Sequence, residues 1–227
     1  GTPGEMKMDP AMVRAVCDKA HELGFLVAAH VESTEGVRVA LEGGVDSIEH
    51  GAAPTDEIMD LFKKNQSFLC TTISPALPYA LFDRSVSNAS EVEQYNGNMV
   101  FEGVIANSKA ALEQGVPVAL GNDVGCPWIT QYDFWRELRY FEKYVDVSRQ
   151  FALHTATLRN AELAGVGDIT GSIEVGKCAD MIVVDSNPLD DLCALRTVKH
   201  VVHRGRFIAA PKVKRNAVVD RELDKFL

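Results

Sequence analysis

Short apolar runs and amphipathic stretches alternate along the first two-thirds of the chain. The run Phe25–Ala29 is apolar at every position, which is typical of a parallel strand buried on both faces. Before it, apolar side chains recur at helical spacing from Met12 to Ala20, and Asp9 followed by Pro10 predicts where that helix begins. A glycine between the two is suited to the left-handed backbone that ends a helix. The pattern therefore predicts a helix, a glycine stop and a buried strand.

The same unit recurs further along the chain, with Thr34 and Thr55 as candidate helix caps. Helices are predicted at Glu35–Glu42, Asp56–Lys64 and Glu91–Gln114, and strands at Val45–Ile48, Ser67–Ile73 and Val116–Leu120. Strands that alternate with helices indicate an α/β fold with a parallel sheet, either half a TIM barrel or an open doubly wound sheet. No glycine-rich phosphate-binding pattern follows a strand, so the nucleotide-binding fold lacks its usual support.

The pattern changes after residue 165. Two helical stretches, Gln131–Tyr144 and Ser148–Gly165, are followed by a turn-rich segment, a strand at Met181–Asp185 and a hairpin over Lys199–Phe207. Ala217–Leu227 predicts a terminal helix. We therefore expect a partial (β/α) barrel over residues 1–165, and a small β unit with a terminal helix over residues 166–227.

One segment fits neither pattern. Ser74–Gly97 contains Pro75, Pro78 and several Ser and Asn residues, and it follows a predicted strand. A long connection at the carboxyl end of a strand lies where barrels build their active sites. We interpret it as a loop that covers the substrate.

Three residues with ligand chemistry stand at the predicted ends of strands. His30 follows the first strand, His50 the second and Asp123 the last. A metal that activates water needs imidazoles and carboxylates that converge from different strands. Taken singly, a histidine after a strand is more often a core or rim residue. On spacing alone, a metal site and a structural role are about equally supported.

Composition indicates which classes of binding partner and which cellular compartment to expect for this protein. Lys plus Arg is 23 and Asp plus Glu is 32, which gives a net charge of −9 and argues against nucleic acid as a partner. No apolar stretch approaches the roughly 20 residues that cross a bilayer, so we expect no membrane association. The five cysteines form no CxxC pair, and their odd number fits reduced thiols in a cytoplasmic protein.

The pieces together resemble the amidohydrolase superfamily, in its prolidase-like and imidazolonepropionase-like branch. The similarity is carried by Val27-Ala-Ala-His30, by Gly44-Val-Asp-Ser-Ile-Glu-His-Gly51 and by Gly121-Asn-Asp123. It continues through Thr155–Ala161, Gly171–Asp185 and Asn187-Pro188. The resemblance covers nearly the whole chain.

The resemblance implies a TIM-like barrel that holds one or two divalent metals, most often zinc. His30 and His50 correspond to the metal-binding histidines after the fifth and sixth strands. Asp123 corresponds to the aspartate after the eighth strand, which is a metal ligand and the catalytic proton acceptor. The implied reaction is cleavage of an amide or peptide-like C–N bond of a small-molecule or dipeptide-like substrate, with metal-activated hydroxide. A related hydrolytic deaminase is the alternative enzyme.

The chain departs from the family in one respect. Family members carry an HxH pair after the first strand, and this sequence has none. By the resemblance the chain holds roughly strands five to eight, and Gly1–Met8 is the loop that leaves the fourth. An open barrel exposes unpaired backbone and apolar surface. We therefore expect a homo-oligomer or a complementing amino-terminal segment, and the non-enzymatic alternative is an inactive barrel fragment that self-associates.

Overall fold

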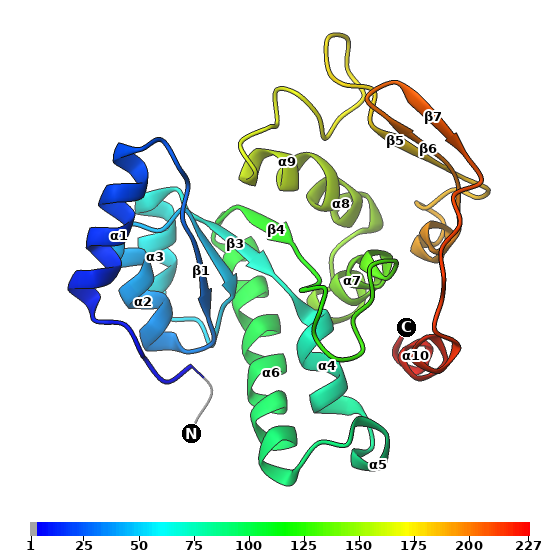
Figure 1. Cartoon of the computed structure of the whole chain (residues 1–227). Helices are drawn as coiled ribbons and strands as arrows, with labels where there is room; N and C mark the ends of the chain where they lie inside the picture. Colours follow the sequence, from blue (N-terminus) through cyan, green and yellow to red (C-terminus); the bar gives the residue numbers. More distant parts are fainter. Residues whose placement is uncertain (1–3) are drawn as a thin grey trace. The chain divides into compact units, whose positions relative to one another are not determined.

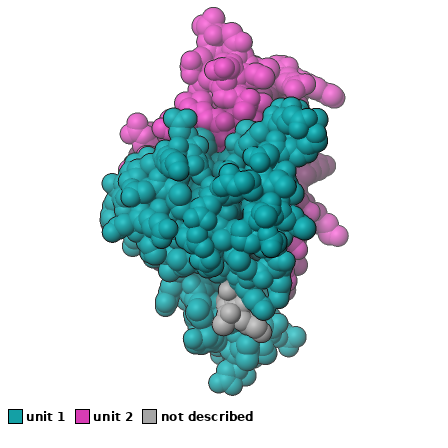
Figure 2. Space-filling model, turned by 90° about the vertical axis from the view of Figure 1, so that its left-hand side faces the viewer, with its two compact units in different colours: residues 1–121 teal, residues 122–227 magenta. Residues whose placement is uncertain are grey.

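The computed structural model describes residues 4–227, so the first three residues of the predicted loop Gly1–Met8 lie outside it. The chain divides into two compact units, residues 1–121 and 122–227, which are coloured separately in Figure 2. The predicted domain boundary after residue 165 falls inside the second unit, and that domain division stays a prediction.

The first unit is a parallel sheet with helices, as the alternating pattern predicts. Its strands are β1 (Ala28–Val31), β2 (Ser47–His50), β3 (Phe68–Thr71) and β4 (Val118–Leu120), hydrogen-bonded in that order and all parallel (Figure 1). Its helices are α1 (Pro10–Glu22), α2 (Thr34–Gly43), α3 (Asp56–Asn65), α4 (Ile73–Leu81), α5 (Arg84–Ser87) and α6 (Glu91–Glu113). The α/β class is therefore confirmed. Placing the strands as the fifth to eighth of a barrel stays a proposal.

Polar side chains fix where these helices begin. Asp9 accepts a hydrogen bond from the Ala11 backbone N–H at 2.8 Å, and Pro10 takes the first helical position of α1. Thr55 caps α3 as predicted, whereas α2 is capped by Ser33 rather than by Thr34. The predicted start of α6 is confirmed, and Ser90 forms a capping box with Glu93 there.

The core of the first unit lies between the sheet and its helices. Ile48 and Leu69 on neighbouring strands are fully buried, as are Met59 and Phe62 of α3. Each fully buried side chain of this size contributes roughly 1.5–3 kcal/mol relative to an exposed one. This packing holds the strand ends, and the residues on them, in fixed positions.

Strands β1 and β2 begin two or three residues later than the apolar runs predict. Phe25 and Leu26 are 65% and 61% exposed and precede β1. Asp46 Oδ2 accepts a hydrogen bond from the Val27 backbone N–H at 2.7 Å, which ties the entrance of β1 to the entrance of β2. As a result, His30 and His50 lie among the last two residues of their strands rather than beyond them.

The predicted loop Ser74–Gly97 is wrong, because most of this segment is helical. It forms most of α4, all of α5 and the first residues of α6. Pro75 occupies the third position of α4, where the missing N–H has no helical acceptor to lose, and Pro78 lies inside the helix. The segment is therefore a packed part of the first unit.

The second unit combines short helices with an antiparallel sheet. It contains α7 (Phe134–Tyr140), α8 (Arg149–His154), α9 (Asn160–Leu163) and α10 (Ala217–Leu223), with π-helical turns at Phe141–Val145 and Thr155–Arg159. Its sheet is β5 (Met181–Val184), β6 (Val198–His203) and β7 (Arg206–Ala209). The predicted hairpin around Gly205 and the terminal helix are confirmed.

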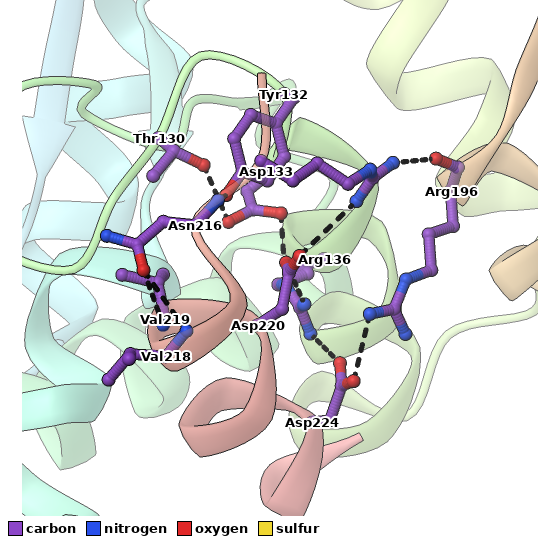
Figure 3. A network of polar contacts seen from close by, with 11 residues as sticks. Thr130, Tyr132, Asp133, Arg136, Arg196, Asn216, Val218, Val219, Asp220 and Asp224 are labelled. Atoms are coloured by element: carbon purple, nitrogen blue, oxygen red, sulfur yellow. Dashed lines mark hydrogen bonds and ion pairs between the residues drawn. The ribbon is translucent and has the colours of Figure 1, made fainter. Parts of the chain in front are cut away.

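A buried arginine joins α10 to α7 within the second unit (Figure 3). Arg136 is 1% exposed and pairs with Asp133 at 3.1 Å and Asp220 at 3.0 Å. Its third partner, Asp224, lies at 2.5 Å and also pairs with Arg196 at 2.9 Å. Burial opposes the charged form of Arg136, but these carboxylates outweigh it and raise the pKa of the guanidinium. These ion pairs hold α10 and the residues after it against α7.

Within residues 4–227, none of the helices combines the length and the apolar character that crossing a bilayer requires.

Candidate metal centre

Two of the predicted ligands lie side by side at the carboxyl edge of the parallel sheet. Strands β1 and β2 pair so that Val31 is opposite His50, which places His30 one residue back on the neighbouring strand. The two imidazole rings lie 4.6 Å apart between centroids and meet edge to face at 79°. His30 is exposed and His50 is 7% exposed. The predicted convergence of His30 and His50 is therefore observed.

The backbone at His50 is unusual. Its φ is 71°, a left-handed conformation that few residues other than glycine adopt, and Gly51 follows with φ 83°. A side chain at Gly51 would place its Cβ 2.3 Å from Nδ2 of Asn107, so a larger residue would displace the buried Asn107 amide. Such strained positions cluster at functional sites. β2 ends at this turn, with His50 as its last residue.

Thr72 holds His50 in place. His50 Nδ1 and Thr72 Oγ1 share a hydrogen bond at 2.6 Å, and Thr72 is only 4% exposed. Glu49, which adjoins His50 in the sequence, accepts a hydrogen bond from the Ser47 hydroxyl at 2.6 Å. Sequence reasoning missed Thr72. The available signal was its position directly after β3, the strand beside β2.

Asp123 belongs to the second unit and is exposed there. Its φ is 49°, so it shares the left-handed backbone of His50. The Cys126 thiol donates a hydrogen bond to Asp123 Oδ2 at 3.1 Å. This carboxylate therefore stands on a tight loop with one oxygen engaged by a neighbouring side chain.

The donor set fits a borderline divalent cation in part. Imidazole nitrogens are preferred zinc ligands, and a ligating histidine ordinarily has its second ring nitrogen held by a hydrogen bond, as Thr72 holds Nδ1 of His50. Across residues 4–227, no group of three or more His, Cys, Asp or Glu side chains is arranged to hold a metal ion. His30 and His50 thus fit two positions of a metal's coordination shell.

Other residues with ligand chemistry have structural partners. His21 contacts Asp46 at 2.8 Å and His203 contacts Asp180 at 3.0 Å, each on an exposed surface. Within residues 4–227, no two of the five cysteines are joined by a disulfide bond. Among the residues just described, His30 and His50 of the first unit are therefore the pair placed to bind a ligand together.

Comparison with known proteins gives a consistent family. The model of the Amidohydrolase family matches residues 2–208. A solved structure from Bifidobacterium longum, described as a candidate prolidase, is 39% identical with a TM-score of 0.95 and is matched over 98% of this chain and 56% of its own. A Xaa-Pro dipeptidase structure is 31% identical with a TM-score of 0.82, over 91% of this chain and 50% of its own.

The imidazolonepropionase of Caldanaerobacter subterraneus subsp. tengcongensis is 27% identical over 202 residues, which are 87% of this chain and 43% of that enzyme. The chain thus spans about half the length of the relatives it matches. Family model, sequence relatives and solved structures agree on this family. The chain belongs to the amidohydrolase family, in its prolidase-like and imidazolonepropionase-like branch.

Proposed function

We propose that this chain supplies one side of a divalent-metal site that hydrolyses an amide or peptide-like C–N bond. The observation that carries the proposal is the His30–His50 pair, 4.6 Å apart at the sheet edge, with His50 tied to Thr72. Two convergent imidazoles and a hydrogen bond to the second ring nitrogen form a recurrent arrangement around catalytic metals. Family membership supports a hydrolase acting on C–N bonds.

His30 and His50 hold the cation in this proposal, and zinc is the metal that best suits imidazole ligands. When bound, the cation makes water acidic, lowering its pKa from about 15.7 to about 7. Asp123 is the third ligand and accepts the proton of the attacking water. It then returns that proton to the leaving amine nitrogen.

Chain connectivity supports the inclusion of Asp123. Gly121, the last residue of the first unit, packs against Thr72, because a Cβ at Gly121 would lie 3.2 Å from Thr72 Cγ2. Asp123 follows two residues later, so it stands just beyond the carboxyl end of β4, where the resemblance implies the third ligand.

The proposed substrate is a small molecule or a dipeptide-like compound. A Xaa-Pro dipeptidase and an imidazolonepropionase are among the relatives, and both names describe small substrates. The remaining strands and ligands of the barrel are proposed to come from a further polypeptide segment, since the chain spans about half of its relatives.

Replacing Asp123 by Asn tests the proton-accepting role. In the assembly that includes the remaining barrel segment, the zinc-loaded Asp123→Asn variant is expected to hydrolyse Xaa-Pro dipeptides and acyl-amino acids about 10²–10⁴-fold more slowly than the parent, because an amide cannot take the proton. Amine release is measured against Asp146→Asn, a matched control that is also exposed and has φ 68° in the same unit. If Asp123→Asn and Asp146→Asn both hydrolyse these substrates at the rate of the parent, Asp123 is not the proton acceptor and the proposal is wrong.

An exposed apolar surface beside the site supports the need for a further segment. We name as the α1–β1 face the side chains that are about half exposed or more around these elements, namely Met12, Val16, Leu23, Phe25 and Leu26. Within residues 4–227, β1 pairs only with β2, so its other side is an open edge. A groove of about 800 Å³ next to it is lined by Met6, Val16 and His30. A β-strand with apolar side chains, added parallel to β1, fits this edge and encloses His30.

The purified chain is accordingly expected to bind an apolar fluorescent dye and to associate with rising concentration. Phe25→Gln combined with Leu26→Gln is expected to reduce both, since these side chains are the most exposed of the face. Dye fluorescence and static light scattering are the measurements. A monomer that binds no dye at any concentration would show that the face needs no partner.

A further inference from the structure

We infer that Thr72 is a positioning residue of the metal site, which selects the ring nitrogen that His50 presents to the cation. The inference rests on the proposed function and adds a residue to it. Because Nδ1 of His50 lies 2.6 Å from Thr72 Oγ1, coordination falls to Nε2. An imidazole that binds a metal through Nε2 carries its proton on Nδ1, so Nδ1–H donates to the Thr72 hydroxyl oxygen.

The helix that follows Thr72 makes this role more specific. Thr72 is the N-cap residue of α4, yet its hydroxyl makes no capping hydrogen bond. Threonine at this position ordinarily accepts from the N–H two or three residues later. The third position of α4 is Pro75, which has no N–H to offer. The local sequence thus removes one of the two usual donors, and the Thr72 hydroxyl is hydrogen-bonded to His50 instead of capping α4.

Burial strengthens the effect of the contact. Thr72 is 4% exposed and His50 is 7% exposed, so water competes little for this hydrogen bond. The left-handed backbone of His50 and the packing of Asn107 beside Gly51 fix the position from which the ring extends. Backbone and hydroxyl together define the direction of Nε2.

The neighbouring Thr71 provides a matched control. It is the last residue of β3, is fully buried, and its hydroxyl shares a hydrogen bond with Ser108 rather than with a histidine. Thr71→Val and Thr72→Val therefore remove the same group from adjacent buried positions. A general loss of stability affects both variants, whereas a loss of histidine orientation affects only Thr72→Val.

The test uses two readouts on the full chain. Zinc affinity, measured by competition with a chromophoric chelator, is expected to fall about 10–100-fold in Thr72→Val, as for other outer-shell partners. Thr72→Ser, which keeps the hydroxyl, and Thr71→Val are expected to bind zinc like the parent. Zinc binding by Thr72→Val that equals the parent overturns the inference.

The second readout is the histidine tautomer in the metal-free chain, from long-range ¹H–¹⁵N correlation spectra at about pH 8.5, where an ordinary imidazole is neutral. The His50 signal, identified by its loss in His50→Ala, is expected to show Nδ1–H in the parent and in Thr72→Ser, and to shift toward Nε2–H in Thr72→Val. An Nε2–H tautomer in the parent overturns the inference. If the parent binds no zinc, the proposed function fails, while the tautomer still decides the role of Thr72.

Discussion

His50→Ala is expected to weaken divalent-metal binding by at least about 100-fold, since loss of an outer-shell partner alone costs 10–100-fold and His50 is proposed as a direct ligand. The ring is the better fixed of the two imidazoles, because it is buried, held by Thr72 and placed 4.6 Å from His30. Its removal leaves His30 as the one remaining imidazole of the proposed pair. Metal content after dialysis against buffered zinc, measured by plasma mass spectrometry, gives the result.

His203→Ala is the control for this experiment. His203 also contacts a carboxylate, but its side chain is 69% exposed and it lies in the antiparallel sheet of the second unit. Its replacement is expected to leave metal content unchanged. If His50→Ala retains as much zinc as His203→Ala, His50 is not a ligand.

Arg136→Ala is expected to destabilise the second unit by about 3 kcal/mol or more, because removing one partner of a buried ion pair leaves uncompensated charges. Three carboxylates face the guanidinium, from Asp133 before α7 and from Asp220 and Asp224 at the end of the chain. Without the guanidinium, the three carboxylates repel one another in a partly buried environment. Helix α10 then loses its ion pair to Arg136. Urea unfolding followed by circular dichroism measures the change, and limited proteolysis reports release of residues 216–227.

The control is Arg221→Ala, an arginine of α10 whose side chain is 68% exposed and pairs with Glu222. Exposed pairs contribute between 0 and about 1 kcal/mol, so little change is expected. Equal urea midpoints for the Arg136→Ala and Arg221→Ala variants would show that the buried network does not hold α10.

Helix ends were predictable from local chemistry, and strand ends were not. Thr55 and Gly115 mark helix boundaries through a side-chain cap and a left-handed stop, which depend on a few adjacent residues. A continuous apolar run carries no such marker. Phe25 and Leu26 therefore look like strand residues in the sequence, although β1 begins after them, beyond the hydrogen bond from the Val27 backbone N–H to the Asp46 carboxylate.

Part of the metal centre could be predicted from the sequence, and part of it depends on contacts that only the fold shows. His30 and His50 were found because parallel strands bring their carboxyl ends to one edge, which topology alone dictates. Thr72 was missed because a threonine after a strand ordinarily caps the next helix, and only the fold shows that its hydroxyl turns to His50. Ser74–Gly97 was misread because Pro75 and Pro78 look like helix breakers, while Pro75 occupies a position where the N–H is dispensable.

The central claim is that His30 and His50 bind one cation together. X-ray absorption at the zinc edge of the zinc-loaded chain tests it most directly, because imidazole rings give a distinct multiple-scattering signal. The account predicts two imidazole nitrogens at about 2.0–2.1 Å, with oxygen in the remaining positions, and one imidazole fewer in His50→Ala. A shell without imidazole, or one dominated by sulfur at about 2.3 Å, would contradict it.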